Sequence, residues 1–168
     1  MKKIETVKVL QSYHFMRYLL SLFLIIFSNL SEAQVAILKV RNLQPLNFTY
    51  SNISELSQQK IINNAIQLEL KIKKKPCYVT AQLAMDQGAS DYANKIYLRQ
   101  ASTTSASAVV SNISVPLSSA PAQLFTQPAS GNMMQDYYFS YDVVIPPING
   151  FLTPGFHTFH ITFTVTQP

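Results

Sequence analysis

Hydrophobic and polar residues alternate strictly near the end of the chain. The apolar positions are Phe159, Ile161, Phe163 and Val165. Threonines and one histidine occupy the positions between them. Because successive side chains of a β-strand point to opposite faces of a sheet, this pattern predicts a strand with one buried and one solvated face. Burial of the four apolar side chains would stabilise the fold by roughly 6–12 kcal/mol as an upper bound, so we expect this closing strand to be essential to the core.

A second alternating segment lies upstream, from Tyr137 to Ile145. Pro146-Pro147 ends it, since proline cannot donate a hydrogen bond to a sheet ladder. The turn pair Pro154-Gly155 precedes the closing strand. The connection of residues 146–155 is too long for a tight hairpin, so the two strands either pair with each other or lie in opposite sheets.

Two more alternating segments flank a turn of lysines and proline. The first runs from Ile66 to Lys73 and the second from Cys77 to Leu83, around Lys74-Lys75-Pro76. Two such segments around a short turn predict neighbouring strands. Weaker strand patterns lie at Val35–Arg41, Leu46–Tyr50, Ile96–Gln100 and Val109–Val115.

The remaining segments lack this alternation. Residues 52–64 either hold a short helix, with Asn52 and Glu55 as a capping box, or form an irregular connection. Polar or proline-containing stretches predict loops at Asp86–Asn94, Ala101–Ala108 and Pro116–Asn132. The last of these has few periodic apolar positions, so we expect it to be a mobile or partner-facing loop.

The arrangement of these segments predicts the fold class. No segment resembles a crossover helix, and no repeat or second domain is evident. Short, frequent strands of this kind predict an all-β fold, an Ig-like antiparallel β-sandwich of about seven or eight strands. We expect residues 34–168 to form it as a single domain, since a chain of this length buries a core without disulfides.

An apolar run from Tyr18 to Leu30 precedes this domain and is followed by Ser31-Glu32-Ala33. A basic start, an apolar stretch and a small-x-small site are typical of a cleaved signal peptide, which predicts residues 1–33 as the leader and Gln34 as the new N-terminus. Met16 is an alternative initiator. The run is shorter than the about 20 apolar residues of a spanning helix, so no transmembrane span is expected in the mature chain. We expect a secreted or cell-surface protein, with periplasmic transit in a Gram-negative bacterium.

The charge of the mature part is mild. Nine Lys and Arg and six Asp and Glu follow residue 33, which gives a net charge of about +3. Nucleic-acid binding usually needs a concentrated basic face, so no nucleic-acid partner is expected. Lys71 and Lys73 to Lys75 form the one charge cluster. These lysines either meet an acidic glycan or an anionic surface, or protect a strand end from edge-to-edge pairing; the second interpretation is favoured.

The residues with catalytic or ligand-binding chemistry are few, and we expect neither an enzyme nor a cofactor or metal site. The mature chain has two histidines, His157 and His160, whose spacing on a strand places them on opposite faces. Cys77 is the single cysteine, so no disulfide forms within the chain, and a small buried apolar role is favoured. Tyr138 is expected to face outward from its strand, which makes it the candidate contact for a sugar ring.

The closing segment Pro154-Gly155-Phe156-His157-Thr158-Phe159-His160-Ile161-Thr162-Phe163-Thr164-Val165 resembles that of pilin-type subunits. Spore-coat-U-type proteins and chaperone–usher fimbrial subunits end similarly, and Pro45–Tyr50 and Pro76–Leu83 resemble their early strands. This resemblance implies an incomplete Ig-like sandwich whose missing strand comes from the N-terminal arm of a neighbouring subunit. The family often carries a disulfide, which a chain with one cysteine cannot form internally.

Two functions follow as expectations. The first is a secreted or surface structural protein, a fimbrial subunit that assembles with its own or related subunits by β-strand complementation. Its donor arm would be Gln34–Arg41, with Ala36, Leu38 and Val40 on one face. The alternative is a monomeric extracellular module that binds a carbohydrate or another ligand through Tyr138 and the loops Asp86–Asn94 and Pro116–Asn132.

Overall fold

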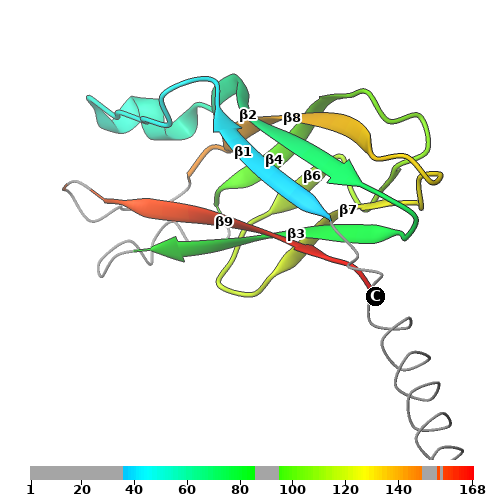
Figure 1. The fold of residues 1–168 in the computed structure, drawn as a ribbon. Coiled ribbons are helices and arrows are strands. Elements are labelled where there is room, and N and C mark those ends of the chain that lie inside the picture. Colours follow the sequence, from blue (N-terminus) through cyan, green and yellow to red (C-terminus); the bar gives the residue numbers. More distant parts are fainter. Residues whose placement is uncertain (1–35, 86–94, 149–154, 156) are drawn as a thin grey trace, which may run out of the picture. The chain divides into compact units, whose positions relative to one another are not determined.

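Nine strands in two antiparallel sheets, packed face to face, make up most of the described chain (Figure 1). The computed structural model describes residues 36–85, 95–148, 155 and 157–168. The predicted leader and the expected loop at Asp86–Asn94 lie outside these residues. The fold is therefore the predicted all-β, Ig-like sandwich, with nine strands in its described part rather than seven or eight.

The larger sheet has the strand order β1-β2-β8-β4-β6. Its strands are β1 (Ile37–Asn42), β2 (Lys60–Ile72), β8 (Gln135–Ile145), β4 (Tyr97–Thr103) and β6 (Ser114–Pro116). The alternation from Tyr137 to Ile145 is thus explained by β8, which lies at the centre of this sheet. Its core-facing side chain Phe139 stacks on Phe125 of the other sheet at a centroid distance of 3.8 Å.

The smaller sheet has the order β5-β7-β3-β9. Its strands are β5 (Val109–Val110), β7 (Ala122–Gln127), β3 (Cys77–Met85) and β9 (Phe159–Thr166). The closing strand of the sequence is β9, and it pairs with β3 from Met85–Phe159 to Tyr78–Thr166. Because β8 and β9 belong to different sheets, the long connection between them crosses from one layer to the other.

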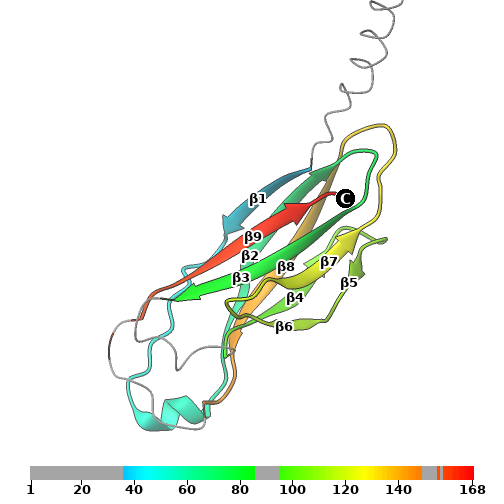
Figure 2. The same cartoon turned by 90° about the horizontal axis from the view of Figure 1, so that it is seen from below.

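The prediction that β2 and β3 are neighbouring strands was wrong. They are consecutive in the chain but belong to opposite sheets (Figure 2). Lys74 takes the left-handed conformation, with a φ of 64°, and Lys75 N–H donates to the Lys73 carbonyl at 2.7 Å. The turn takes the chain across the sandwich rather than back along the same sheet. A strand buries one face whether it pairs with its predecessor or joins the opposite sheet, so the alternation of apolar residues is the same in both cases.

The prediction of a mobile or partner-facing loop at Pro116–Asn132 was also wrong, because β7 lies within it. Phe125 and Gln127 of this strand are fully buried. Alternation is interrupted because β7 carries an irregularity against β3: Val79 pairs with Phe125, but the next residue, Thr80, pairs with Gln123. Leu124 has no partner in this register and is buried together with Phe125. This β-bulge places two successive apolar residues in the core, so the sequence of β7 does not alternate with a period of two.

Residues 52–64 contain a short 3₁₀ helix, η1 (Ile53–Ser57), and the beginning of β2. The predicted cap is confirmed, since Asn52 Oδ1 accepts from Glu55 N–H at 3.1 Å and Asn52 Nδ2 donates to Glu55 Oε1. Lys60 pairs with Glu55 at 2.8 Å, and this hydrogen bond lowers the pKa of the Glu55 carboxyl. The weak strand pattern at Leu46–Tyr50 forms no strand.

Candidate functional site

The outer edge of β9 is the most conspicuous unpaired feature of the sandwich. In a constant-type immunoglobulin sandwich, strands A, B, E and D form one sheet and C, F and G the other. The order β1-β2-β8-β4 corresponds to A, B, E and D, and β3-β9 corresponds to C and F. In the part of the chain that the structure describes, β9 is an edge strand, and no strand occupies the position of G.

The backbone groups that face out of this edge follow from the pairing of β3. The N–H of Leu83 donates to the carbonyl of Ser118, just before β7, at 2.8 Å. Alternate residues of a strand hydrogen-bond to opposite sides, so the neighbouring Gln82 bonds towards β9. Its partner there is Thr162. The N–H and C=O of the next residue, Ile161, therefore point out of the free edge.

The core-facing side of the same edge is incompletely covered. The apolar side chains of β9 that alternate with exposed ones are Phe159, Ile161, Phe163 and Val165, and all four are only half-buried. They were expected to form the closing part of the core, and the structure places them against the core cluster but at its margin. The margin exists because β9 is the last strand of its sheet on this side.

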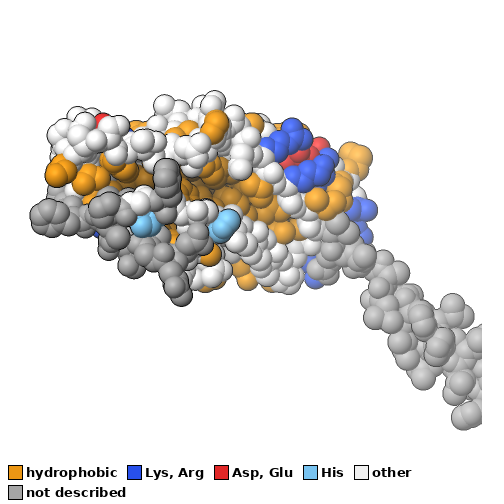
Figure 3. Space-filling view, turned by 90° about the vertical axis from the view of Figure 1, so that its left-hand side faces the viewer, with side chains coloured by type: hydrophobic (Ala, Val, Ile, Leu, Met, Phe, Trp, Pro, Cys, Tyr) orange, Lys and Arg blue, Asp and Glu red, His pale blue; other side chains and the backbone are white. Residues whose placement is uncertain are grey.

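β1 lies opposite, at the corresponding edge of the other sheet, and contacts β9 (Figures 1 and 2). Its core-facing Leu38 is half-buried, and Val40 remains 46% exposed although it pairs with the fully buried Leu68. Figure 3 shows hydrophobic side chains gathered in a band along this side of the molecule. We call the core-facing apolar residues of the two edges the apolar seam: Leu38, Val40, Phe159, Ile161, Phe163 and Val165.

The residues of the candidate donor arm lie within the chain's own sheet. Ile37–Asn42 pair in register with Lys71–Ile66 of β2, so this segment forms the first strand of the domain in the structure. Leu38 and Val40 belong to the apolar seam, and Ala36 is half-buried just before the strand. The weak strand pattern at Val35–Arg41 thus corresponds to a strand of the domain itself.

An ionic network on the solvent face of β1 and β2 reinforces that pairing. The Glu69 carboxylate is 5% exposed, and Arg41 Nη2 donates to it at 2.9 Å. Lys39 and Lys71 lie within 3.8 Å and 3.5 Å of the same carboxylate. Lys71 also donates to Asp136 of β8 at 3.1 Å, and this hydrogen bond raises the pKa of Lys71. Detachment of β1 would remove two of the three cations around a nearly buried carboxylate, so β1 is held by more than its ladder.

Tyr138, the candidate sugar contact, lies on β8 in the middle of the larger sheet. Its side chain is half-buried, and its N–H donates to Thr104 Oγ1 at 3.0 Å. Of the two loops expected to act with it, one lies outside the described residues and the other contains β7 in the smaller sheet. The structure does not bring Tyr138 together with β7 on one face, because they belong to different sheets.

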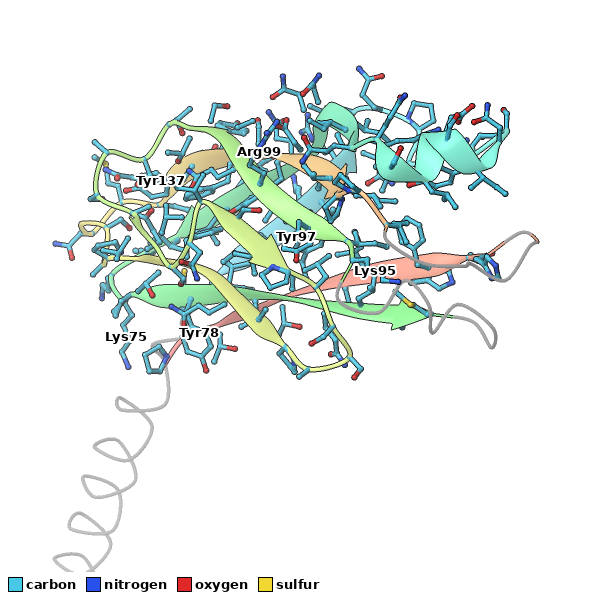
Figure 4. The ribbon with its side chains drawn as sticks, turned by 180° about the vertical axis from the view of Figure 1, so that it is seen from behind. Lys75, Tyr78, Lys95, Tyr97, Arg99 and Tyr137 are labelled. Atoms are coloured by element: carbon cyan, nitrogen blue, oxygen red, sulfur yellow. The ribbon has the colours of Figure 1, made fainter. Side chains whose placement is uncertain are left out.

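Figure 4 shows the opposite side of the sandwich, where Tyr97 and Arg99 of β4 are labelled. Arg99 donates from Nε and Nη2 to Asp142 Oδ2 at 3.0 and 2.7 Å. The other carboxylate oxygen accepts the N–H of Asn64 at 2.8 Å, at the point where β2 shifts its register against β8 and Asn64 adopts a φ of 47°. These contacts pair a nearly buried carboxylate with a guanidinium and a backbone N–H, and they serve the fold.

Cys77 is fully buried at the start of β3, and burial raises the pKa of its thiol to about 11. His160 points to the exposed face of β9. Within the described residues, no group of three histidine, cysteine or carboxylate side chains is arranged to hold a metal ion. No helix in the described part of the chain is long and apolar enough to cross a membrane.

We expect Cys77 of the folded protein to react very slowly with an aromatic disulfide reagent at neutral pH. The thiolate is the reacting species, and both burial and the raised pKa suppress it. The measurement is the release of the coloured thiol, with the same protein in guanidinium chloride as the fully reactive control. Rapid stoichiometric labelling of native protein would contradict the buried position.

Comparison of the chain with protein-family models, with curated proteins and with solved structures gives no match.

Proposed function

We propose that this protein is a secreted or surface structural subunit that assembles by accepting a β-strand from a neighbouring subunit at the free edge of β9. The support is the combination of an unpaired ladder and an uncovered apolar face on the same strand. An incoming strand with alternating apolar residues would hydrogen-bond to β9 and place its side chains on the apolar seam. The interaction would complete a sandwich that the described residues leave open at the position of strand G.

The exposure of the seam supports this occupant over a small ligand. An edge strand with a flat apolar face is a hazard for aggregation unless it is covered, charged or bulged. The described part of β9 carries none of these protections, because its residues are apolar, threonine and one histidine, and its register against β3 is regular. A strand from a second subunit supplies the two missing interactions together, the backbone ladder and the apolar cover.

The donor in this proposal is an extended segment of a second subunit other than the ordered β1. In the structure β1 is paired with β2 and holds the charge network at Glu69. Use of Gln34–Arg41 as the donor arm would require β1 to leave this position. We therefore expect deletion of residues 34–41 to destabilise the domain that receives a strand and also to remove any arm that this segment supplies. The deletion does not distinguish a role as a strand of the domain from a role as a donor arm.

A proline at position 161 tests assembly at the β9 edge without removing a strand of the domain. Ile161→Pro removes an N–H that points out of the free edge and places a ring in the path of an incoming strand, whereas the ladder to β3 remains. Ile161→Ala removes a similar part of the side chain but keeps the N–H. We expect Ile161→Pro to fold with the far-ultraviolet spectrum of Ile161→Ala but to lose assembly. Thr162→Pro is expected to unfold the edge, because Thr162 hydrogen-bonds to β3.

Assembly is measured on protein recovered from cells, by an unboiled denaturing gel and by light scattering. A ladder of heat-sensitive oligomers for the native chain and Ile161→Ala, with monomer for Ile161→Pro, is the expected result. Equal ladders for Ile161→Pro and Ile161→Ala would exclude the β9 edge as the site. A single monomer for the native chain, boiled or not, would exclude strand exchange and favour a monomeric ligand-binding module.

A further inference from the structure

The basic residues of the domain gather at one end of the sandwich. Six of the nine Lys and Arg after residue 33 lie on β1, at the end of β2 and in the turn to β3. They are Lys39, Arg41, Lys71, Lys73, Lys74 and Lys75. Two carboxylates, Glu69 and Asp136, lie among them, so the net side-chain charge of this end is +4. The net charge of residues 34–168 is only +3, and the rest of the domain is therefore slightly acidic.

Two exposed methionines lie at the same end. The loop between β7 and β8 runs beside the β2–β3 turn, since Lys74 N–H donates to the Gly131 carbonyl at 3.3 Å and Ser130 Oγ donates to the Ile72 carbonyl at 2.9 Å. Met133 follows in this loop and is 79% exposed, and Met134 is 43% exposed. We call the six basic residues and these two methionines the basic tip.

Lys73 and Lys75 have charge to offer a partner. Lys73 is exposed and Lys75 is half-buried, and no carboxylate of the described residues forms an ion pair with either. Figure 4 shows Lys75 projecting from this end of the sandwich. By contrast, Lys71 is occupied by Glu69 and Asp136. The unengaged charge is thus furthest from the strands, next to the methionines.

We propose that the basic tip docks on an anionic phospholipid bilayer, with Met133 and Met134 entering the interface. Basic side chains near an anionic leaflet attract it, and adjacent apolar side chains bury themselves at the boundary between headgroups and acyl chains. An acidic polysaccharide would match the charge but would leave the methionines exposed. The two features together therefore favour a lipid surface over an acidic glycan.

The observations behind this inference lie in the β2–β3 turn and the β7–β8 loop, so it does not depend on strand exchange at β9.

The test is flotation of the protein with vesicles of equal parts phosphatidylglycerol and phosphatidylcholine, against vesicles of phosphatidylcholine alone. The protein is purified from cells and its N-terminus is determined, so that all variants are compared in the same form. We expect binding to the anionic vesicles that weakens with salt, because the Debye length falls from about 30 Å at 0.01 M to about 8 Å at 0.15 M ionic strength.

Paired variants distinguish binding through the basic tip from the effect of net charge and from non-specific adsorption of exposed apolar residues. Lys73→Gln with Lys75→Gln is expected to weaken binding about fivefold per lysine. Gln58→Glu with Gln59→Glu lowers the net charge equally at the exposed residues before β2 and is expected to bind as the native chain does. Met133→Ser is expected to weaken binding severalfold, whereas Ile53→Ser, at an equally exposed position on η1, is not.

Three results would overturn the proposal. One is equal loss of binding in the lysine pair and the glutamine pair, which would indicate only net charge. Another is equal binding to both kinds of vesicle in every variant, which would assign the binding to the apolar run or to non-specific contact. The third is retention on an acidic polysaccharide, lost in the lysine pair, together with no binding to vesicles; this would make the partner a glycan.

Discussion

Replacement of Phe139 by alanine is expected to lower the free energy of unfolding by about 3–5 kcal/mol. Phe139 is fully buried on β8, at the centre of the larger sheet, and stacks on Phe125 of β7 with an interplanar angle of 16°. This contact joins the two layers, so truncation leaves a cavity between two sheets that cannot close independently. Domains of this size unfold with about 5–15 kcal/mol in total, which makes the loss a large part of the stability.

Tyr138→Ala is the matched control for Phe139→Ala, since the adjacent residue on the same strand faces the other side and is half-buried. We expect it to cost about 1 kcal/mol. Thermal unfolding followed by circular dichroism should show a fall of about 10–20 °C for Phe139→Ala. Similar losses for both variants would mean that β8 does not alternate between core and surface as described.

Replacement of Arg99 by alanine is expected to cost about 3 kcal/mol. The Asp142 side chain is only 8% exposed, and Arg99 contributes two of its hydrogen bonds. Without the guanidinium, a nearly buried carboxylate retains the Asn64 N–H as its one remaining hydrogen-bond donor among the described residues. The destabilisation comes from the charge left behind, more than from the loss of the pair itself.

A double variant distinguishes these two causes. Asp142→Asn keeps an oxygen for the Asn64 N–H and removes the charge, so we expect Arg99→Ala with Asp142→Asn to be more stable than Arg99→Ala alone. Asp136→Ala is the control for a carboxylate of the same strand that is 41% exposed, and it should cost at most about 1 kcal/mol. Urea unfolding measures the native chain, the single variants Arg99→Ala and Asp142→Asn, their double variant, and Asp136→Ala. Additive losses in the double variant would contradict the buried-charge explanation.

The sequence predicted the strands that bury one face and expose the other. The alternation of β3 and β9 survives because these two strands have a continuous register against each other. The apolar positions of β8 alternate in the sequence although β2 and β4 both carry irregularities in their pairing with it. The cap at Asn52 was predictable for a similar reason, since it depends on residues three apart in the chain. Such features are local, and the period of two or the spacing of a cap is written directly into the order of residues.

The sequence did not reveal β7, and it suggested the wrong relation between β2 and β3. The bulge at Leu124 places two successive residues in the core, so the window has no clean period. Alternation also does not state which sheet a strand joins. A turn that crosses between layers and one that forms a hairpin connect strands of identical pattern, and here the pairing of β2 with β8 and of β3 with β7 and β9 decides between them.

The basic tip and the apolar seam differ in how far they could be predicted from the sequence. The lysines of the β2–β3 turn are adjacent in the sequence, and a charge cluster was recognisable there. Lys39, Arg41 and Met133 join it only because β1 pairs with β2 and the β7–β8 loop contacts the turn. The apolar seam was not predictable, since Phe163 and Leu68 show the same pattern in the sequence. One lies at the margin and the other at the centre of the core.

The sequence by itself therefore determined that this chain forms β-strands with one apolar face and, in outline, a sandwich of two such layers. The tertiary structure decided which strands are central and which are edges. The physical reason is that burial of an alternating face is a local demand, which many sheet orders satisfy equally well. Whether a strand has a partner on each side depends on hydrogen bonds between residues far apart in the chain, and the free edge of β9 is a property of that pairing alone.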